Sequence, residues 1–184
     1  MLANLSNFFI RIAKGWIILL ALLVMLVCEA ILLPNAQATI EDASGGTGPI
    51  DLLFFYSAAT AHEMIASYGD AGRAAYRTTE LTTDILFPIA YTLFLALSIT
   101  WLFQRAFDRG SAVQYLNLAP LGAWLFDLLE NIGVVIMLSA FPTQSFMVAF
   151  LTSVATGLKW AFAFFSLILL IFGAIAYLVS RFRK

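Results

Sequence analysis

The sequence predicts an all-α membrane protein, with four transmembrane helices in an antiparallel bundle, a helical extracytoplasmic loop and both termini in the cytoplasm. Three observations lead to this fold class. Hydrophobic residues make up 62% of the 184 residues and charged residues only 11%, whereas soluble domains hold about 45–50% and about 25%. The apolar residues fall in four long runs, and most basic residues lie on one side of those runs.

Each apolar run is long enough to cross the hydrocarbon core, which takes about 20 residues of helix. The expected spans are residues 16–33, 85–103, 118–141 and 147–179 of a single membrane domain, 1–184. Each is interpreted as a helix, because an isolated strand leaves its backbone groups unpaired in lipid. The last run exceeds the required length, so we expect it to tilt or to extend beyond the hydrocarbon core.

The positions of Lys and Arg set the orientation, because basic residues favour the cytoplasmic side. Only Arg73 and Arg77 lie in the long loop after the first span. The other basic residues outside the spans are Arg11, Lys14, Arg105, Arg109, Arg181, Arg183 and Lys184. Both termini are therefore expected in the cytoplasm. The expected location is the cell membrane, as a multi-pass protein, and the inner membrane if the source is a bacterium.

The first run also resembles a secretory signal peptide. RIAKGWIILL provides a basic start and an apolar core, and NAQA at 35–38 provides the small residues of a cleavage site. However, the apolar stretch is long for a signal peptide and contains Glu29. We expect the first span to be retained.

The loop at 34–84 is the largest element outside the expected spans. It opens with the linker ASGGTGP, followed by IDLLFFY, an apolar patch expected to lie on the bilayer surface or to cap the bundle. Thr60 and Glu63 have the spacing of a capping box, which predicts a short helix that runs to Tyr68. Gly69 suits the end of that helix, and Asp70 suits the start of another that continues into the second span.

The third span contains polar groups that hydrocarbon disfavours. Asp127, Glu130 and Asn131 have the spacing i, i+3, i+4 and share one helix face. Each ionised group at a span centre costs about 2.5–3.5 kcal/mol, so these groups require partners. Lys159 of the fourth span lies at nearly the same depth, and the short turn FPTQS makes the two spans neighbours. We expect Lys159 to face Glu130, Asp127 or both.

Two carboxylates against one lysine leave an excess negative charge. In a medium of low dielectric constant that excess is unfavourable, so we expect one carboxylate to share or hold a proton near neutral pH. The sequence does not indicate which one. Together, Asp127, Glu130, Asn131 and Lys159 form the predicted ligand or proton site.

A second polar group is expected nearer the outer surface. Asp84, Pro88 and Tyr91 fall on one face of the second span, and Pro88 leaves the Asp84 carbonyl without its usual helical donor. Glu29 of the first span lies at a similar depth. Asp84, Tyr91 and Glu29 are therefore predicted to line an acidic outer vestibule above Lys159.

Several other functions are excluded or disfavoured. The net charge of −1, without an internal basic cluster, argues against a nucleic-acid partner. One cysteine, Cys28, and one histidine, His62, exclude a Cys/His zinc site within one chain. HEMIA lacks the second histidine of a metalloprotease motif. We expect no cofactor and no metal, with His62, Glu63 and Asp70 as the alternative metal set.

Three classes of function remain. The first is binding or translocation of a small ligand, ion or proton through the Asp/Glu/Lys site. The second is a membrane enzyme that acts on a lipid or isoprenoid, with the carboxylates as acid and base. The third is a non-catalytic subunit or assembly factor, in which the polar groups serve packing. The expected partners are the lipid bilayer, a small ligand or lipid, and further copies of the chain or a larger membrane complex.

Overall fold

The computed structural model describes residues 2–108 and 110–182, and every regular element in this part of the chain is helical. Arg109, Arg183 and Lys184, which contribute to the predicted orientation, lie outside the described residues. The α-helices are α1 (Leu2–Ile12), α2 (Gly15–Val27), α3 (Leu33–Ser44), α4 (Ala58–Ser67), α5 (Gly69–Glu80), α6 (Thr83–Ala106), α7 (Ala119–Ala140) and α8 (Phe146–Phe182). A π-turn, η1 (Cys28–Leu32), and the 3₁₀ helices η2 (Ile50–Leu52) and η3 (Ala112–Leu118) complete the described elements.

The prediction of a helical protein with four potential membrane spans is confirmed. Among the described residues, four helical segments are long and apolar enough to cross a membrane, namely Gly15–Ser44, Gly69–Ala106, Ala112–Ala140 and Phe146–Phe182. They contain 30, 38, 29 and 37 residues, against the requirement of about 20. Each segment therefore extends beyond the hydrocarbon core or tilts within it.

The first segment is longer than expected, because α2 continues through η1 into α3. The sequence interpretation ended this span at residue 33 and assigned residues 34–84 to a loop. Pro34 has no N–H and crowds the carbonyl four residues earlier, so a proline at this position predicts the end of a helix. The π-turn before it widens the helix, with the Leu33 N–H bonded to the Cys28 carbonyl, and the chain stays helical to Ser44.

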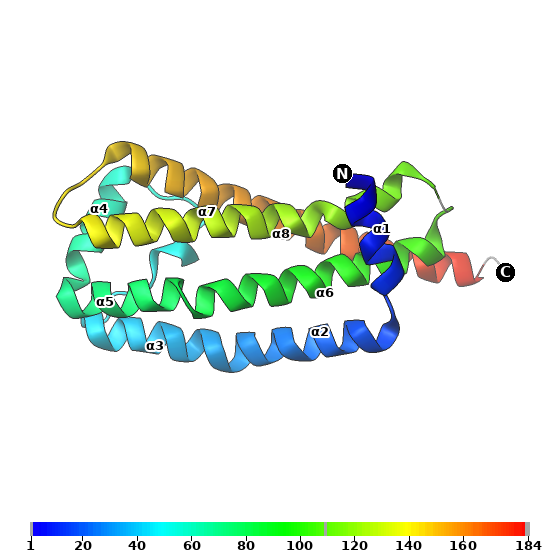
Figure 1. The fold of residues 1–184 in the computed structure, drawn as a ribbon, viewed down its shortest axis with the longest axis horizontal. Coiled ribbons are helices and arrows are strands. Elements are labelled where there is room, and N and C mark those ends of the chain that lie inside the picture. The colour runs from blue at the N-terminus through cyan, green and yellow to red at the C-terminus, as the bar shows by residue number, and fades with distance from the viewer. Residues whose placement is uncertain (1, 109, 183–184) are drawn as a thin grey trace.

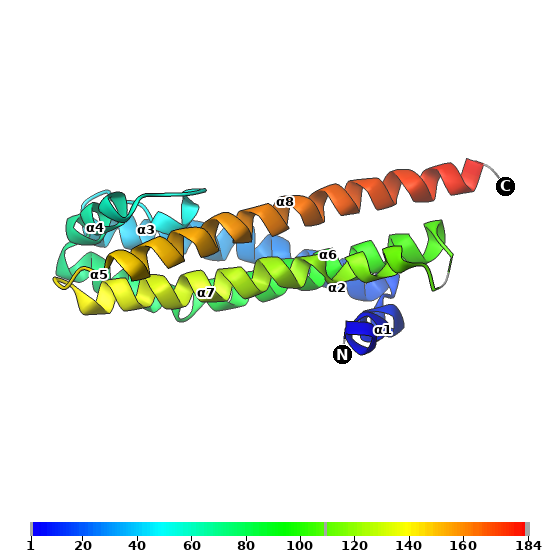
Figure 2. The same cartoon turned by 90° about the horizontal axis from the view of Figure 1, so that it is seen from above.

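The helices lie side by side along one long axis (Figure 1). Both chain ends and α1 are at one end of this axis, and α4, α5 and the α7–α8 turn are at the other. We call these the α1 end and the α4 end. The most extensive pairing is between α7 and α8, while α6 contacts α2, α7 and α8. Figure 2 shows α8 close to α7 near the α4 end and further from it towards the C-terminus.

The connection between α3 and α6 is folded against the α4 end of the bundle. Its core combines residues of this connection with others from α3, α7 and α8: Ile40, Ile50, Tyr56, Ala61, Ile65, Tyr68, Tyr76, Val134, Met137, Leu138 and Ala149. The Tyr68 and Tyr76 rings meet edge to face with centroids 5.3 Å apart. This cluster holds η2 and the extended residues after it against α8, where Asp51 and Phe54 reach Lys159 and Trp160.

The capping-box prediction for α4 is wrong, although the predicted helix end is confirmed. Ser57 is the N-terminal cap, and its Oγ accepts a hydrogen bond of 3.0 Å from the Thr60 N–H. Thr60 is therefore in the first turn of the helix and is not the cap, because Ser57, three residues earlier, already accepts from its N–H group. The helix ends before Tyr68, and α5 begins at Gly69, whose φ of 63° suits glycine.

Candidate functional site

An ion-pair centre joins α7 and α8 within the bundle. The Lys159 ammonium pairs with the Glu130 carboxylate and lies 3.7 Å from Asp127 Oδ1. The exposed fractions of these side chains are 11% for Lys159, 0% for Glu130 and 9% for Asp127. The prediction that Lys159 faces Glu130, Asp127 or both is therefore confirmed, and the structure shows both pairings. Buried charges of this kind need such partners, because no water compensates them.

The sequence of each helix explains why these groups face inward. On α7, Asp127, Glu130 and Asn131 are buried, whereas Leu128, Leu129 and Ile132 between and beside them are exposed. This pattern directs one face towards the protein and the other towards lipid. The facing surface of α8 consists of small buried residues, Thr152, Ala155 and Thr156, and it allows close helix packing.

The second oxygen of Glu130 also has a partner. The Thr156 hydroxyl donates to Glu130 Oε1 over 2.6 Å and lies 3.4 Å from the Tyr56 hydroxyl. Tyr56 is fixed by its backbone, since its N–H donates to Ser153 Oγ and Ser153 Oγ donates to its carbonyl, at 3.0 and 2.7 Å. Burial raises the pKa of the Tyr56 phenol well above its usual range, so this hydroxyl stays protonated beside the centre.

Asn131 satisfies the carbonyl that Pro88 leaves without a helical donor. Pro88 lies inside α6, and the Asp84 carbonyl, four residues earlier, has no N–H opposite it. Asn131 Nδ2 donates to this carbonyl over 2.8 Å. The Asp84 carbonyl, which Pro88 is expected to leave unpaired, therefore accepts a hydrogen bond from the Asn131 side chain of α7.

This contact leads to a testable prediction. Asn131→Leu should lower the free energy of unfolding by about 1–3 kcal/mol, because it leaves the Asp84 carbonyl buried without a donor. In a Pro88→Ala background the restored N–H at position 88 can bond the same carbonyl, so the same replacement should cost less. A double-mutant cycle measured by reversible unfolding in mixed micelles tests this. Equal losses in both backgrounds would contradict the assignment.

Two of the three predicted vestibule residues lie beside the centre. The Tyr91 hydroxyl donates to Asp127 Oδ2 over 3.1 Å, and the Asp84 side chain borders a cleft described below. Glu29 does not join them. It lies in η1 with its side chain exposed on the bundle surface, whereas its neighbour Cys28 is buried.

Three residues that sequence reasoning missed belong to the same region. The Asp51 carbonyl lies 3.4 Å from Lys159 Nζ, and its carboxylate accepts a 2.5 Å hydrogen bond from the Tyr76 hydroxyl. Glu80 is only 1% exposed, and neither of its carboxylate oxygens has a hydrogen-bond partner. Its strongest electrostatic neighbours are the carboxylates of Asp51 and Asp84. The spacing of Tyr76, Glu80, Asp84 and Pro88, each four residues from the next, is the signal that could have revealed this face.

A cleft leads from the surface near the α4 end to the carboxylates of Asp51 and Asp84. It opens between α3 and the start of α6, under η2, and its polar lining residues are Gln37, Asp51, Thr79 and Asp84. Its volume is about 50 Å³, enough for a few water molecules or a small cationic group. We call the residues Asp51, Glu80, Asp84, Asp127, Glu130 and Lys159 the polar centre.

Compared with known proteins, the chain matches no protein family, no characterised protein and no solved structure.

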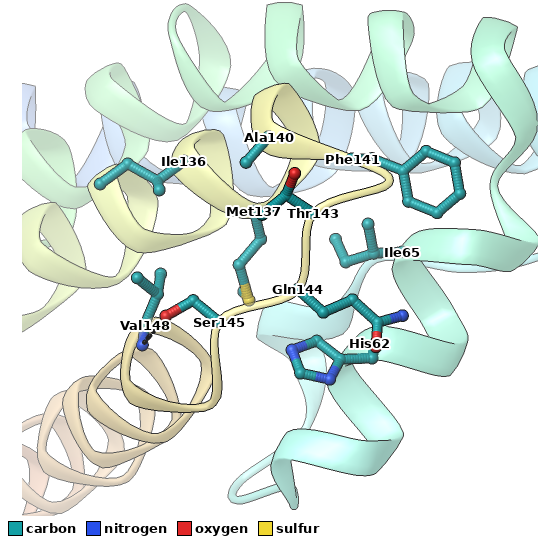
Figure 3. A pocket seen from close by; sticks show the side chains of 10 residues that line it. All are labelled: His62, Ile65, Ile136, Met137, Ala140, Phe141, Thr143, Gln144, Ser145 and Val148. Atoms are coloured by element: carbon teal, nitrogen blue, oxygen red, sulfur yellow. Dashed lines mark hydrogen bonds between the residues drawn. The ribbon is translucent and has the colours of Figure 1, made fainter.

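A second pocket lies at the α4 end, between α4 and the turn from α7 to α8 (Figure 3). His62, Met137, Phe141 and Gln144 are among its lining residues, and His62 Nε2 is buried without a hydrogen-bond partner. The structure does not support the alternative metal set, since Asp70 pairs with Arg73 instead. Among the described residues, no group of three or more His, Cys, Asp or Glu side chains could hold a metal ion.

The α1 end of the bundle is closed by apolar packing. Phe9 and Ala13 contact Ala96 and Leu97, and all four residues are buried. Further along α6, Ile99 and Phe103 are fully buried against α8. The polar centre is therefore connected to the surface on the α4 side. Towards the α1 end these apolar contacts are accompanied by buried polar side chains, such as Asn117, which donates to the Thr100 hydroxyl over 3.0 Å.

The polar centre is suited to acid–base and cation chemistry. It combines carboxylates, one ammonium group and the hydroxyls of Tyr56, Tyr76 and Tyr91, which can donate or accept protons. Arg73, a buried arginine of α5, is committed to Asp70, to the Ile65 carbonyl and to the Phe141 ring. Lys159 therefore faces a larger number of carboxylates than it can compensate.

Proposed function

We propose that this chain is a multi-pass membrane protein that binds a small cation, in the simplest case a proton, at the polar centre. The observation that carries this proposal is the charge imbalance around Lys159. Asp127 and Glu130 pair with this one ammonium group, while Glu80 is buried at 1% exposure without any hydrogen-bond partner. A buried carboxylate in that position is tolerated only if a positive charge compensates it.

The direction of access is also part of the proposal. We assign the α4 end to the extracytoplasmic side, because Arg11, Lys14 and Arg105 lie towards the other end. The bundle is then antiparallel, with both termini in the cytoplasm. The cleft at Asp51 and Asp84 opens on the extracytoplasmic side, and the apolar packing around Phe9 and Leu97 faces the cytoplasm. Binding from outside is the function that this arrangement favours, rather than free passage through a channel.

The two alternatives make different demands. A lipid-modifying enzyme needs its substrate to reach Glu130 or Thr156, and both are 0% exposed. A packing role needs only fixed charges that never exchange protons. The distinguishing property is therefore whether the carboxylates of the polar centre change protonation while the protein stays folded.

Infrared difference spectroscopy on the protein in nanodiscs tests the proposal. Titration across neutral pH should show a protonated-carboxyl band that appears as the pH falls. At least one of Asp127→Asn, Glu130→Gln and Glu80→Gln should remove this band. Asp42→Asn, an exposed carboxylate of α3, is the control and should leave it in place. If none of the three variants alters the titrating bands, the polar centre does not exchange protons and the proposal fails.

A further inference from the structure

The cleft at the α4 end has two contrasting surfaces. Its apolar lining is formed by Leu33, Ala36 and Ile40 of α3 together with Leu52 of η2. Its polar lining includes the carboxylates of Asp51 and Asp84. A ligand that contacts both linings needs a hydrocarbon portion and a positive charge.

Glu80 provides an independent observation next to the cleft. It lies on the buried side of α5 and directly follows Thr79, which lines the cleft. Both oxygens of its carboxyl group are buried and have no hydrogen-bond partner. The cleft itself is lined by the carboxylates of Asp51 and Asp84, and Asp51 already accepts a hydrogen bond from the Tyr76 hydroxyl.

The chemistry of the cleft distinguishes between kinds of cation. Divalent metal ions take several oxygen ligands at once, and among the described residues no group of acidic side chains is arranged for that. A primary ammonium group instead needs a few acceptors at hydrogen-bond distance and tolerates an irregular arrangement. The cleft volume of about 50 Å³ accommodates such a group, and the apolar lining can contact an attached alkyl chain.

We propose that the cleft is a binding site for an alkylammonium cation, with Asp51 and Asp84 as its counter-charges and with Leu33, Ile40 and Leu52 around its alkyl chain. This inference rests on the proposed function in one respect, namely that cations enter at the α4 end. It adds the chemical class of the ligand. The primary amine can belong to a free amine or to a lipid headgroup in the surrounding leaflet, since both carry the same group.

Binding of butylammonium to the protein in phosphatidylcholine nanodiscs is the direct test. We expect saturable binding by isothermal titration calorimetry, weakened about tenfold or more by Asp84→Asn and by Asp51→Asn. Butan-1-ol, which has the alkyl chain without the charge, should not bind. Asp42→Asn is the matched control on α3 and should bind butylammonium as the wild-type protein does. Thermal unfolding of each variant confirms that it is folded.

The lipid source is tested in the same system. If the headgroup amine of phosphatidylethanolamine occupies the cleft, nanodiscs that contain this lipid should weaken butylammonium binding in the wild-type protein. If the source is a free amine, the affinity should not depend on this lipid. Both results support the site and identify its source.

Three results would overturn the inference. These are equal binding by wild type, Asp84→Asn and Asp51→Asn, binding of butan-1-ol as tight as that of butylammonium, and displacement of butylammonium by equimolar sodium or potassium. Failure here is distinguishable from failure of the proposed function. If only the cleft proposal fails, at least one of the three variants in the infrared test still alters the titrating carboxyl bands although butylammonium binding does not depend on Asp51 and Asp84. If the proposed function fails, none of those variants alters the bands.

Discussion

Replacement of Lys159 by methionine is expected to destabilise the protein by about 3–5 kcal/mol near neutral pH. Lys159 is the ammonium partner of Glu130, which is 0% exposed, and of Asp127. Removal of one member of a buried pair leaves the other charge uncompensated, and here two carboxylates lose their partner together. The measurement is the free energy of unfolding in mixed micelles, at matched lipid and detergent composition.

The pH dependence of this loss has a definite sign. As the pH falls, protonation removes the negative charges that Lys159 otherwise compensates, so the difference between the variant and wild type should shrink. It should grow again as the pH rises. A deficit that is constant with pH would show that Lys159 acts through packing alone.

Two controls accompany this variant. Lys14→Met removes a lysine from an exposed position near the α1 end and should change stability by no more than about 0.5 kcal/mol. The double variant Lys159→Met with Glu130→Gln removes both charges of the closest pair and should recover part of the lost stability. If the double variant is no more stable than Lys159→Met, the charge argument is wrong.

Gly133→Ala should separate α7 from α8 and cost about 1–3 kcal/mol. A Cβ at position 133 would overlap the Thr152 side chain and lies 2.9 Å from Thr152 Cβ, so that one of the helices must move. Thr152 cannot rotate away freely, because its hydroxyl donates to the Val148 carbonyl over 2.7 Å. Since Glu130 and Thr156 lie one turn along from this contact, the change should also disturb the polar centre.

Gly157→Ala is the matched control for this prediction. It is also a glycine of a membrane-spanning helix, but its nearest neighbour is the Phe54 carbonyl oxygen at 3.7 Å, an ordinary contact. Alanine there should be neutral or stabilising by up to about 1 kcal/mol, from its higher helix propensity. Reversible unfolding of the two variants gives the comparison. Equal effects at both positions would refute the argument from close packing.

The sequence was sufficient for the features that depend on one helix at a time. The spacing of Asp127, Glu130 and Asn131 fixed their common face, and counting residues from the α7–α8 turn placed Lys159 at the same depth. Because a short turn forces two consecutive helices to be neighbours, face and depth together identify a pair. The carbonyl of Asp84 was also identified, since the effect of Pro88 on its own helix is local.

The missing parts depend on contacts between distant segments. Asn131 as the partner of Asp84 requires the relative rotation of α6 and α7, which no local pattern defines. Asp51 reaches Lys159 because Tyr76 and Ser153 hold the connection against the bundle, and those contacts involve residues far apart in the chain. The helix after Pro34 was missed for a different reason, because the π-turn that accommodates this proline has no clear sequence signature.

The placement of Lys159 on the last helix has a consequence for biosynthesis. The ribosome completes α7, with Asp127 and Glu130, before it makes the lysine that compensates them. Inserted alone, each ionised carboxylate would cost about 2.5–3.5 kcal/mol at the bilayer centre. Insertion of α7 together with the strongly apolar α8, as a hairpin joined by the turn before Phe146, avoids this intermediate. The ion pairs of Lys159 with Glu130 and Asp127 are then formed during insertion rather than after it, and α7 and α8 form one unit of membrane insertion.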